Sequence, residues 1–206
     1  MAGKRFIVSV LLFLFLVPAA AMAQLETAPD QDSGSGSFFD DIVCIVDAGL
    51  SMPLGDISDF YNSGFVVGFN VFYPWSERFH YGGRIAFNKW GVDDGGWTGT
   101  DIDGSSLMIE FVPMARYLFL NDDASTTTFF AQAGLGFYRF SFDVDVTHES
   151  ETQNFDDSDI NLGLCFGGGM ILEKGNREWI IQPMLNQVFT DGNSSTYLSI
   201  TFGMAF

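Results

Sequence analysis

The segment His148-Glu149-Ser150-Glu151 brings together the residue types of nucleophilic catalysis. A histidine can activate a serine hydroxyl, and a carboxylate can orient the histidine, provided that the three groups meet at a substrate cleft. The segment lies instead in a strongly acidic stretch, with aspartates at positions 143, 145, 156, 157 and 159. The other histidine, His80, belongs to a separate apolar segment. We therefore expect no catalytic residue in this chain.

Three acidic motifs offer the oxygen ligands that Ca²⁺ or Mg²⁺ prefers. They are "DIDG" at 101–104, "DVDV" at 143–146 and "DDSD" at 156–159. None has the spacing and the final glutamate of an EF-hand loop. A solvated acidic surface explains them more simply, so we expect no metal site and no cofactor. Divalent ions bridging these motifs to phosphate groups remain an open alternative.

The charge of the chain limits its partners. The formal net charge is −17, and aromatic residues make up 16% of the sequence. Nucleic acid requires a basic footprint, and anionic headgroups require a basic patch, so neither kind of contact is expected. Two cysteines, Cys44 and Cys165, are few for an exported domain held by disulfides. Because both lie in apolar stretches, we favour small apolar fillers over a disulfide bridge.

The first residues predict export. Lys4 and Arg5 precede an apolar run over 6–17, and Ala21-Met22-Ala23 forms a small-x-small cleavage site. This is the pattern of a secretory signal peptide over 1–23, and the run is short for a membrane-spanning helix. Residues 24–40, rich in Gly and Ser, are expected to be a flexible segment. Residues 41–206 then form one domain.

That domain alternates apolar and small or polar residues with a period of two, which is typical of strands. Eight segments show this period, over 42–52, 64–73, 79–90, 107–119, 128–146, 160–172, 179–189 and 196–206. The expected connections over 53–63, 91–106 and 147–159 are long, and the one over 191–195 is short. In the fifth segment the phase of the alternation changes at Tyr138, which indicates a bulge or a strand that passes beyond its apolar environment.

The face opposite the large apolar residues is unusual for a water-soluble sheet. It is rich in glycine, for example at positions 64, 68, 82, 134, 136, 163, 167, 169 and 203, and it carries few charges. Small residues suit a narrow interior, so the large apolar side chains should point outward into hydrocarbon. The sequence thus predicts an all-β fold, an eight-stranded antiparallel transmembrane up-and-down β-barrel. Aromatic residues near the short-turn end are expected to form an interfacial girdle. They are Tyr73, Trp75, Phe79, Tyr117, Phe119, Trp179 and Phe206.

The expected interior contains a small set of charges, Arg84, Glu110 and Arg116. The third and fourth segments form a hairpin that brings Arg84 close to residues 110–112, so we predict an Arg84–Glu110 pair. Its simplest role is to neutralise charges that would be costly if buried alone. A gating role is the alternative.

The final segment carries a resemblance to a known family. Leu198, Ile200, Phe202, Met204 and Phe206 alternate up to the last residue, after a signal peptide and seven other strands. This arrangement resembles the small outer-membrane barrels of the OmpA/OmpX type, and "SMPLGDISDFYNSGF" resembles the first-loop region of Bacteroidetes-type barrels. The resemblance implies that these five residues are read by the barrel-assembly machinery. It also implies a bacterial outer membrane as the location, with lipid and lipopolysaccharide as surroundings.

We expect a non-enzymatic structural or surface-interaction protein with acidic loops outside, short turns in the periplasm and a lumen filled by side chains. A narrow, porin-like gated pore for ions or small solutes is the first alternative. A lipid A-modifying enzyme is less favoured, because in the barrel deacylases a His-x-Ser motif faces lipid, whereas here it lies in an acidic loop. A secreted soluble barrel that holds a ligand is the last alternative. The sequence indicates no specific ligand and no oligomeric state.

Overall fold

The computed structural model describes residues 42–92, 100–119, 126–148, 151–175, 177–190 and 193–206. The predicted signal peptide and the flexible segment over 24–40 lie outside the described residues. Within them, the strands are β1 (Val43–Leu54), β2 (Gly64–Pro74), β3 (Phe79–Gly91), β4 (Thr100–Phe119), β5 (Thr127–His148), β6 (Glu151–Lys174), β7 (Arg177–Thr190) and β8 (Asn193–Ala205). A 3₁₀ helix, η1 (Gly55–Asp59), follows β1.

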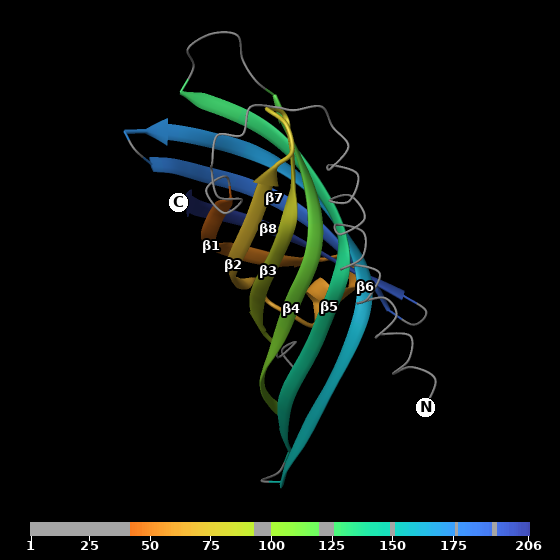
Figure 1. Cartoon of the computed structure of the whole chain (residues 1–206). Helices are drawn as coiled ribbons and strands as arrows, with labels where there is room; N and C mark the ends of the chain where they lie inside the picture. The colour runs from red at the N-terminus through yellow and green to blue at the C-terminus, as the bar shows by residue number, and fades with distance from the viewer. Residues whose placement is uncertain (1–41, 93–99, 120–125, 149–150, 176, 191–192) are drawn as a thin grey trace. The chain divides into compact units, whose positions relative to one another are not determined.

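These strands form a closed antiparallel barrel in which each strand pairs with its neighbours in sequence (Figure 1). The barrel closes between β1 and β8, from Ile45 opposite Ala205 to Leu54 opposite Thr196. Two further backbone hydrogen bonds join Cys44 and Phe206, at 2.9 and 3.2 Å. Closure gives every strand a partner on both sides along the shared barrel wall, so no open sheet edge remains there. The predicted fold is confirmed, and the last alternating segment pairs with the first.

The two faces of the strands are those predicted from the period of two. Along β8, Tyr197, Ser199, Thr201, Gly203 and Ala205 are buried, and Ile200, Phe202 and Phe206 are exposed. Large apolar side chains cover the outer face of the other strands as well, and they include Val46, Leu50, Phe65, Phe69, Ile85, Phe87, Phe111, Leu135, Leu162, Leu164 and Phe166. An exposed apolar surface of this extent indicates an apolar environment or a partner.

Two of the predicted loops are wrong. Residues 91–106 were expected to be a loop, but β4 begins at Thr100; residues 147–159 were expected to be a loop, but β6 begins at Glu151. Backbone pairing continues where the apolar pattern stops, since strands in water need no apolar outer face. The result is a long β5–β6 hairpin that forms the lower tip in Figure 1.

The phase change in β5 is not a bulge. The β5–β6 register runs without interruption from Thr127 opposite Leu172 to His148 opposite Glu151. Tyr138 instead continues the inner face and is fully buried, while Asp143 and Asp145 on the outer face are exposed. The strand therefore passes beyond the apolar belt, which is the second of the two interpretations offered by the sequence.

The expected girdle residues lie near the tight turns at the other end of the barrel. Trp75, Phe79, Tyr117, Phe119 and Phe206 are exposed there. Ring contacts link several of them, including Tyr117 with Phe119 at 5.3 Å between centroids. Outward aromatic rings at one rim are typical of the interfacial belt of membrane barrels. In the described part of the chain, no helix has the length and apolarity to span a membrane.

Cys44 and Cys165 are both free thiols, as the sequence favoured. They lie on opposite faces of the wall: Cys165 is buried on the inner face of β6, and Cys44 belongs to the outer face of β1. A disulfide between them would have to pass through the sheet.

Candidate functional site

Arg84 lies at the centre of the barrel interior and is held by groups from three other strands. Its Nη1 donates to Oδ2 of Asp47 on β1 at 2.7 Å, and its Nη2 donates to the other oxygen, Oδ1, at 3.2 Å. Nη1 also donates to Oδ1 of Asn70 at 3.1 Å, and Nε reaches Oε2 of Glu110 at 3.4 Å. A guanidinium that bridges two carboxylates in this way compensates the desolvation of all three charges.

The contact between Arg84 and Asp47 passes over β2, and a glycine makes room for it. A Cβ atom at Gly68 would lie 2.7 Å from both terminal nitrogens of Arg84 and 2.7 Å from Oδ1 of Asp47. No side chain fits there without moving the ion pair. The inward glycine of β2 is thus part of the site.

Glu110 extends the interior network across the barrel. Its Oε1 accepts hydrogen bonds from Nδ2 of Asn88 at 2.6 Å and from the hydroxyl of Tyr197 at 2.7 Å. Tyr197 is on β8, which lies opposite β4 in the eight-stranded order. The network therefore links opposite walls and closes the interior at this level.

Arg116 lies in a second cluster. It donates to Oε1 of Gln132 at 2.9 and 3.0 Å, and its guanidinium lies 3.9 Å from the ring centroid of Phe72 and 4.3 Å from that of Phe130. Gln182 joins the two clusters, since it accepts from Arg116 at 3.5 Å and donates to Asp47 at 3.0 Å. The three charges named from the sequence thus belong to one connected network, which also contains Asp47.

Asp47 balances the charge of the network. With it, the connected network contains two carboxylates and two guanidinium groups, and all four side chains are at most 2% exposed. Sequence reasoning missed Asp47, as well as Asn70, Gln182 and Tyr197. The alternation of β1 contained the signal, because outward Val46 and Ala48 place Asp47 inside. We name this set the lumen network: Asp47, Asn70, Arg84, Asn88, Glu110, Arg116, Gln132, Gln182 and Tyr197.

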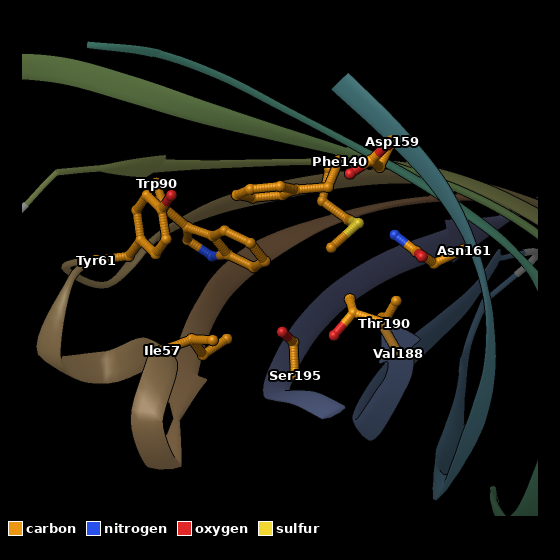
Figure 2. Close-up of a pocket in the computed structure, with 10 residues that line it drawn as sticks. Ile57, Tyr61, Trp90, Phe140, Asp159, Asn161, Val188, Thr190 and Ser195 are labelled. Carbon is orange, nitrogen blue, oxygen red and sulfur yellow. The ribbon is translucent and has the colours of Figure 1, made fainter. Parts of the chain in front are cut away.

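A pocket opens above the lumen network, at the end of the barrel where η1 lies (Figure 2). Its volume is about 120 Å³. Ile57, Tyr61, Trp90, Met108, Phe140 and Val188 form an apolar wall, and Asp159, Asn161, Thr190 and Ser195 add polar groups. We call it the mouth pocket. Trp90 forms its floor: Nε1 donates to Oγ of Ser51 at 2.9 Å, and the ring packs edge-on against Tyr197 at 5.1 Å.

The two histidines lie far apart, whereas the acidic motifs are neighbours in the sheet, with Asp103 opposite Asp145 and Asp143 opposite Asp156 in the registers. His80 pairs with Arg116 in the β3–β4 register, and His148 pairs with Thr100 in the β4–β5 register, so their backbones lie at opposite ends of β4. Glu149 and Ser150 lie outside the described residues. Asp143 and Asp145 both accept from Nδ2 of Asn154, at 2.8 and 2.9 Å. Within the described ranges, no three acidic, histidine or cysteine side chains are grouped to hold a metal ion.

The chain is similar to several solved structures of outer-membrane proteins. Neisserial surface protein A is 14% identical, with a TM-score of 0.51, and the match covers 80% of this chain and 96% of that one. A major outer membrane protein from Thermus thermophilus is 14% identical (TM-score 0.49, 80% and 98% covered), and OprG from Pseudomonas aeruginosa is 13% identical (TM-score 0.48, 80% and 95% covered). No protein-family model and no curated protein matches the chain.

Three observations together define the structural class of this protein. They are the closed barrel, its apolar outer face and the likeness to the neisserial protein. The chain has the OmpA/OmpX-like fold of the small, integral outer-membrane β-barrels. At these levels of identity the likeness defines the fold alone, so the role of the protein has to be argued from its own lumen, mouth and surface.

Proposed function

We propose that this protein is an integral outer-membrane barrel with a non-enzymatic, structural and surface-interaction role. The main support for this proposal is that part of the sheet extends beyond the closed barrel wall. β5 pairs with β4 and β6 up to His148, whereas the pairing of β6 with β7 begins only at Leu162. Among the described strands, residues 151–161 of β6 therefore have no partner on the β7 side.

Along this edge, backbone groups of β6 find no partner strand among the described residues, and an extended segment of another molecule can add there as a strand. The side chains around this edge are acidic and exposed, and they include Asp143, Asp145, Asp156, Asp157 and Asp159. Charge complementarity then favours a partner with an extended basic segment. These carboxylates are not grouped into a metal site, and any divalent ion that bridges them to lipopolysaccharide phosphates would take most of its ligands from phosphate and water.

The remaining elements of the proposal concern membrane insertion. Leu198, Ile200, Phe202 and Met204 lie on the outer face of β8, and Phe206 follows directly after the strand with an exposed side chain. There they are accessible to the barrel-assembly machinery before the barrel closes, and to lipid and lipopolysaccharide afterwards. We propose that they act as the assembly signal.

The surface role is tested with a synthetic peptide of alternating Lys and Val, added to the protein in lipid vesicles. Binding is expected at low salt, and it should weaken strongly at high salt. The same peptide with N-methylated alternate residues cannot complete the strand ladder and is the control. Equal binding of both peptides would show that charge alone is recognised and would contradict strand addition at the β6 edge.

A narrow gated pore is the second candidate, and the double contact of Arg84 favours it. Exchange of Arg84 between Asp47 and Glu110 would move polar groups within the lumen. In the closed arrangement the lumen network blocks passage. Planar-bilayer recordings distinguish the two: the structural role predicts no reproducible channels from the wild type. Reproducible channels that disappear when the lumen is plugged would contradict the structural role and support the gated pore.

A further inference from the structure

The mouth pocket has a composition that points to a ligand class beyond the proposed surface role. Three aromatic rings meet at one side of it: Tyr61 with Phe140 at 5.7 Å, Tyr61 with Trp90 at 6.4 Å and Trp90 with Phe140 at 6.4 Å between centroids. Each ring comes from a different part of the chain, namely the β1–β2 connection, β3 and β5. Aromatic faces gathered around a small space attract cations through the ring quadrupole.

A carboxylate lies beside the Phe140 ring and away from Tyr61 and Trp90. Asp159 is the register partner of Phe140 and therefore lies on the same inner face, and Asn161 follows it on β6. Figure 2 shows Asp159 and Asn161 across the pocket from the rings of Tyr61 and Trp90. Among the described residues, Asp159 takes part in neither of the two ion pairs, which both involve Arg84. The pocket thus offers one exposed negative charge that forms no ion pair with another described residue.

The volume of the pocket and the net charge of the protein further limit which ligands can bind. An apolar cavity of about 150 Å³ holds one benzene molecule, so a pocket of about 120 Å³ admits only a compact group. The net charge of −17 raises the local concentration of cations at the surface and repels anions. Ile57, Met108 and Val188 provide apolar contacts that methyl groups can fill.

We propose that the mouth pocket binds a small methylated ammonium cation of the choline type. The positive centre lies against the rings of Tyr61, Trp90 and Phe140, and Asp159 supplies the counter-charge. The same group occurs as a free ion and as a lipid or polysaccharide headgroup, and the pocket chemistry is shared by both. Asp159 belongs both to this pocket and to the acidic residues along the β6 edge. The two proposals are distinguished by their readouts, because the Trp90 resonance reports on the pocket, whereas strand addition engages the backbone of β6.

The binding experiment uses the full-length protein in an uncharged maltoside detergent, because choline-based detergents would occupy the site. The indole N–H resonance of Trp90, assigned with Trp90→Phe, reports on the pocket during titration with choline. The control ligand is 3,3-dimethyl-1-butanol, which has the same shape without the charge. Choline is expected to shift the Trp90 resonance in a saturable manner. The neutral analogue is expected to bind at least about tenfold more weakly than choline. Equal binding of the two would overturn the proposal in favour of a merely apolar cavity.

Matched variants assign the charge to one residue. Asp159→Asn should weaken choline binding by about three- to tenfold. Asp156→Asn makes the same charge change on the same strand but on its outer face, so it should leave binding within about twofold. Equal losses in both variants would show a general charge effect and contradict the site. Tyr61 lies outside the barrel strands, so Tyr61→Leu leaves the barrel wall intact. This variant should also weaken choline binding.

Phosphocholine distinguishes the two sources. Tighter binding of phosphocholine than of choline assigns the pocket to a headgroup, and weaker binding assigns it to the free ion; both support the recognition of the methylated ammonium. Binding of neither, in protein whose gel migration remains heat-modifiable, would overturn the proposal.

Discussion

Tyr197 on β8 donates a 2.7 Å hydrogen bond to Glu110 on β4, the strand on the opposite side of the barrel. Both side chains are at most 1% exposed. A single phenol thus joins the two halves of the wall through the interior. The Tyr197 ring also packs edge-on against Trp90, so the lumen network directly contacts a residue that lines the mouth pocket.

Removal of this hydroxyl should destabilise the barrel. Tyr197→Phe leaves a buried carboxylate with one fewer donor, and the loss of a hydrogen bond to a charged group costs about 1.5–3 kcal/mol. Urea unfolding in lipid vesicles, followed by heat-modifiable gel migration, measures the free energy of unfolding. Tyr117→Phe, on the outer face, is the matched control and should change it by less than about 0.5 kcal/mol. Equal effects of the two variants would contradict a special role of the Tyr197–Glu110 bond.

Arg84 should be the most sensitive position of the lumen network. Arg84→Met leaves Asp47 and Glu110 facing each other without their shared cation, and removal of one partner of a buried pair costs about 3–5 kcal/mol. The triple variant Arg84→Met, Asp47→Asn, Glu110→Gln removes all three charges and should recover a large part of that loss. If the triple variant is less stable than Arg84→Met, repulsion between the two carboxylates is not the cause.

Phe206 should matter more for insertion than for surface contacts. Its side chain is 68% exposed on the outer face, and its backbone closes the ladder to Cys44. Deletion of Phe206 should lower the amount of heat-modifiable protein in the outer-membrane fraction. Phe206→Tyr keeps an aromatic ring and is expected to insert normally. Normal assembly after deletion would contradict its role in the assembly signal.

Much of the barrel was predictable because a strand that separates a narrow interior from an apolar exterior must alternate. The buried and exposed residues of β8 follow this rule without exception. The same rule placed Arg84 and Glu110 inside, and the expected hairpin between the third and fourth segments placed them near each other. Asp47 was overlooked because a single acid within an apolar stretch gives no charge pattern, although its position in the alternation places it inside.

The extended strands were not predictable from alternation. In the segments over 100–106 and 151–159 polar residues occupy both faces, and such a pattern is typical of loops. These segments are strands because the registers of β4, β5 and β6 within the barrel wall continue without a shift into the part beyond it. The mouth pocket could not be predicted either, because it requires Tyr61, Trp90 and Phe140 to meet from three separate elements.

The central claim is that the outer face of the barrel contacts hydrocarbon. The most direct test places the same charge at two positions on the outer face of β6, one inside the apolar belt and one beyond it. Leu164→Arg puts a cation in the apolar belt, where it should cost about 2–4 kcal/mol in lipid vesicles. Ser158→Arg puts the same cation on the same face, about 20 Å further along the strand. It should cost no more than about 1 kcal/mol. Small and equal costs at both positions would mean that the outer face is in water, and would contradict the membrane barrel.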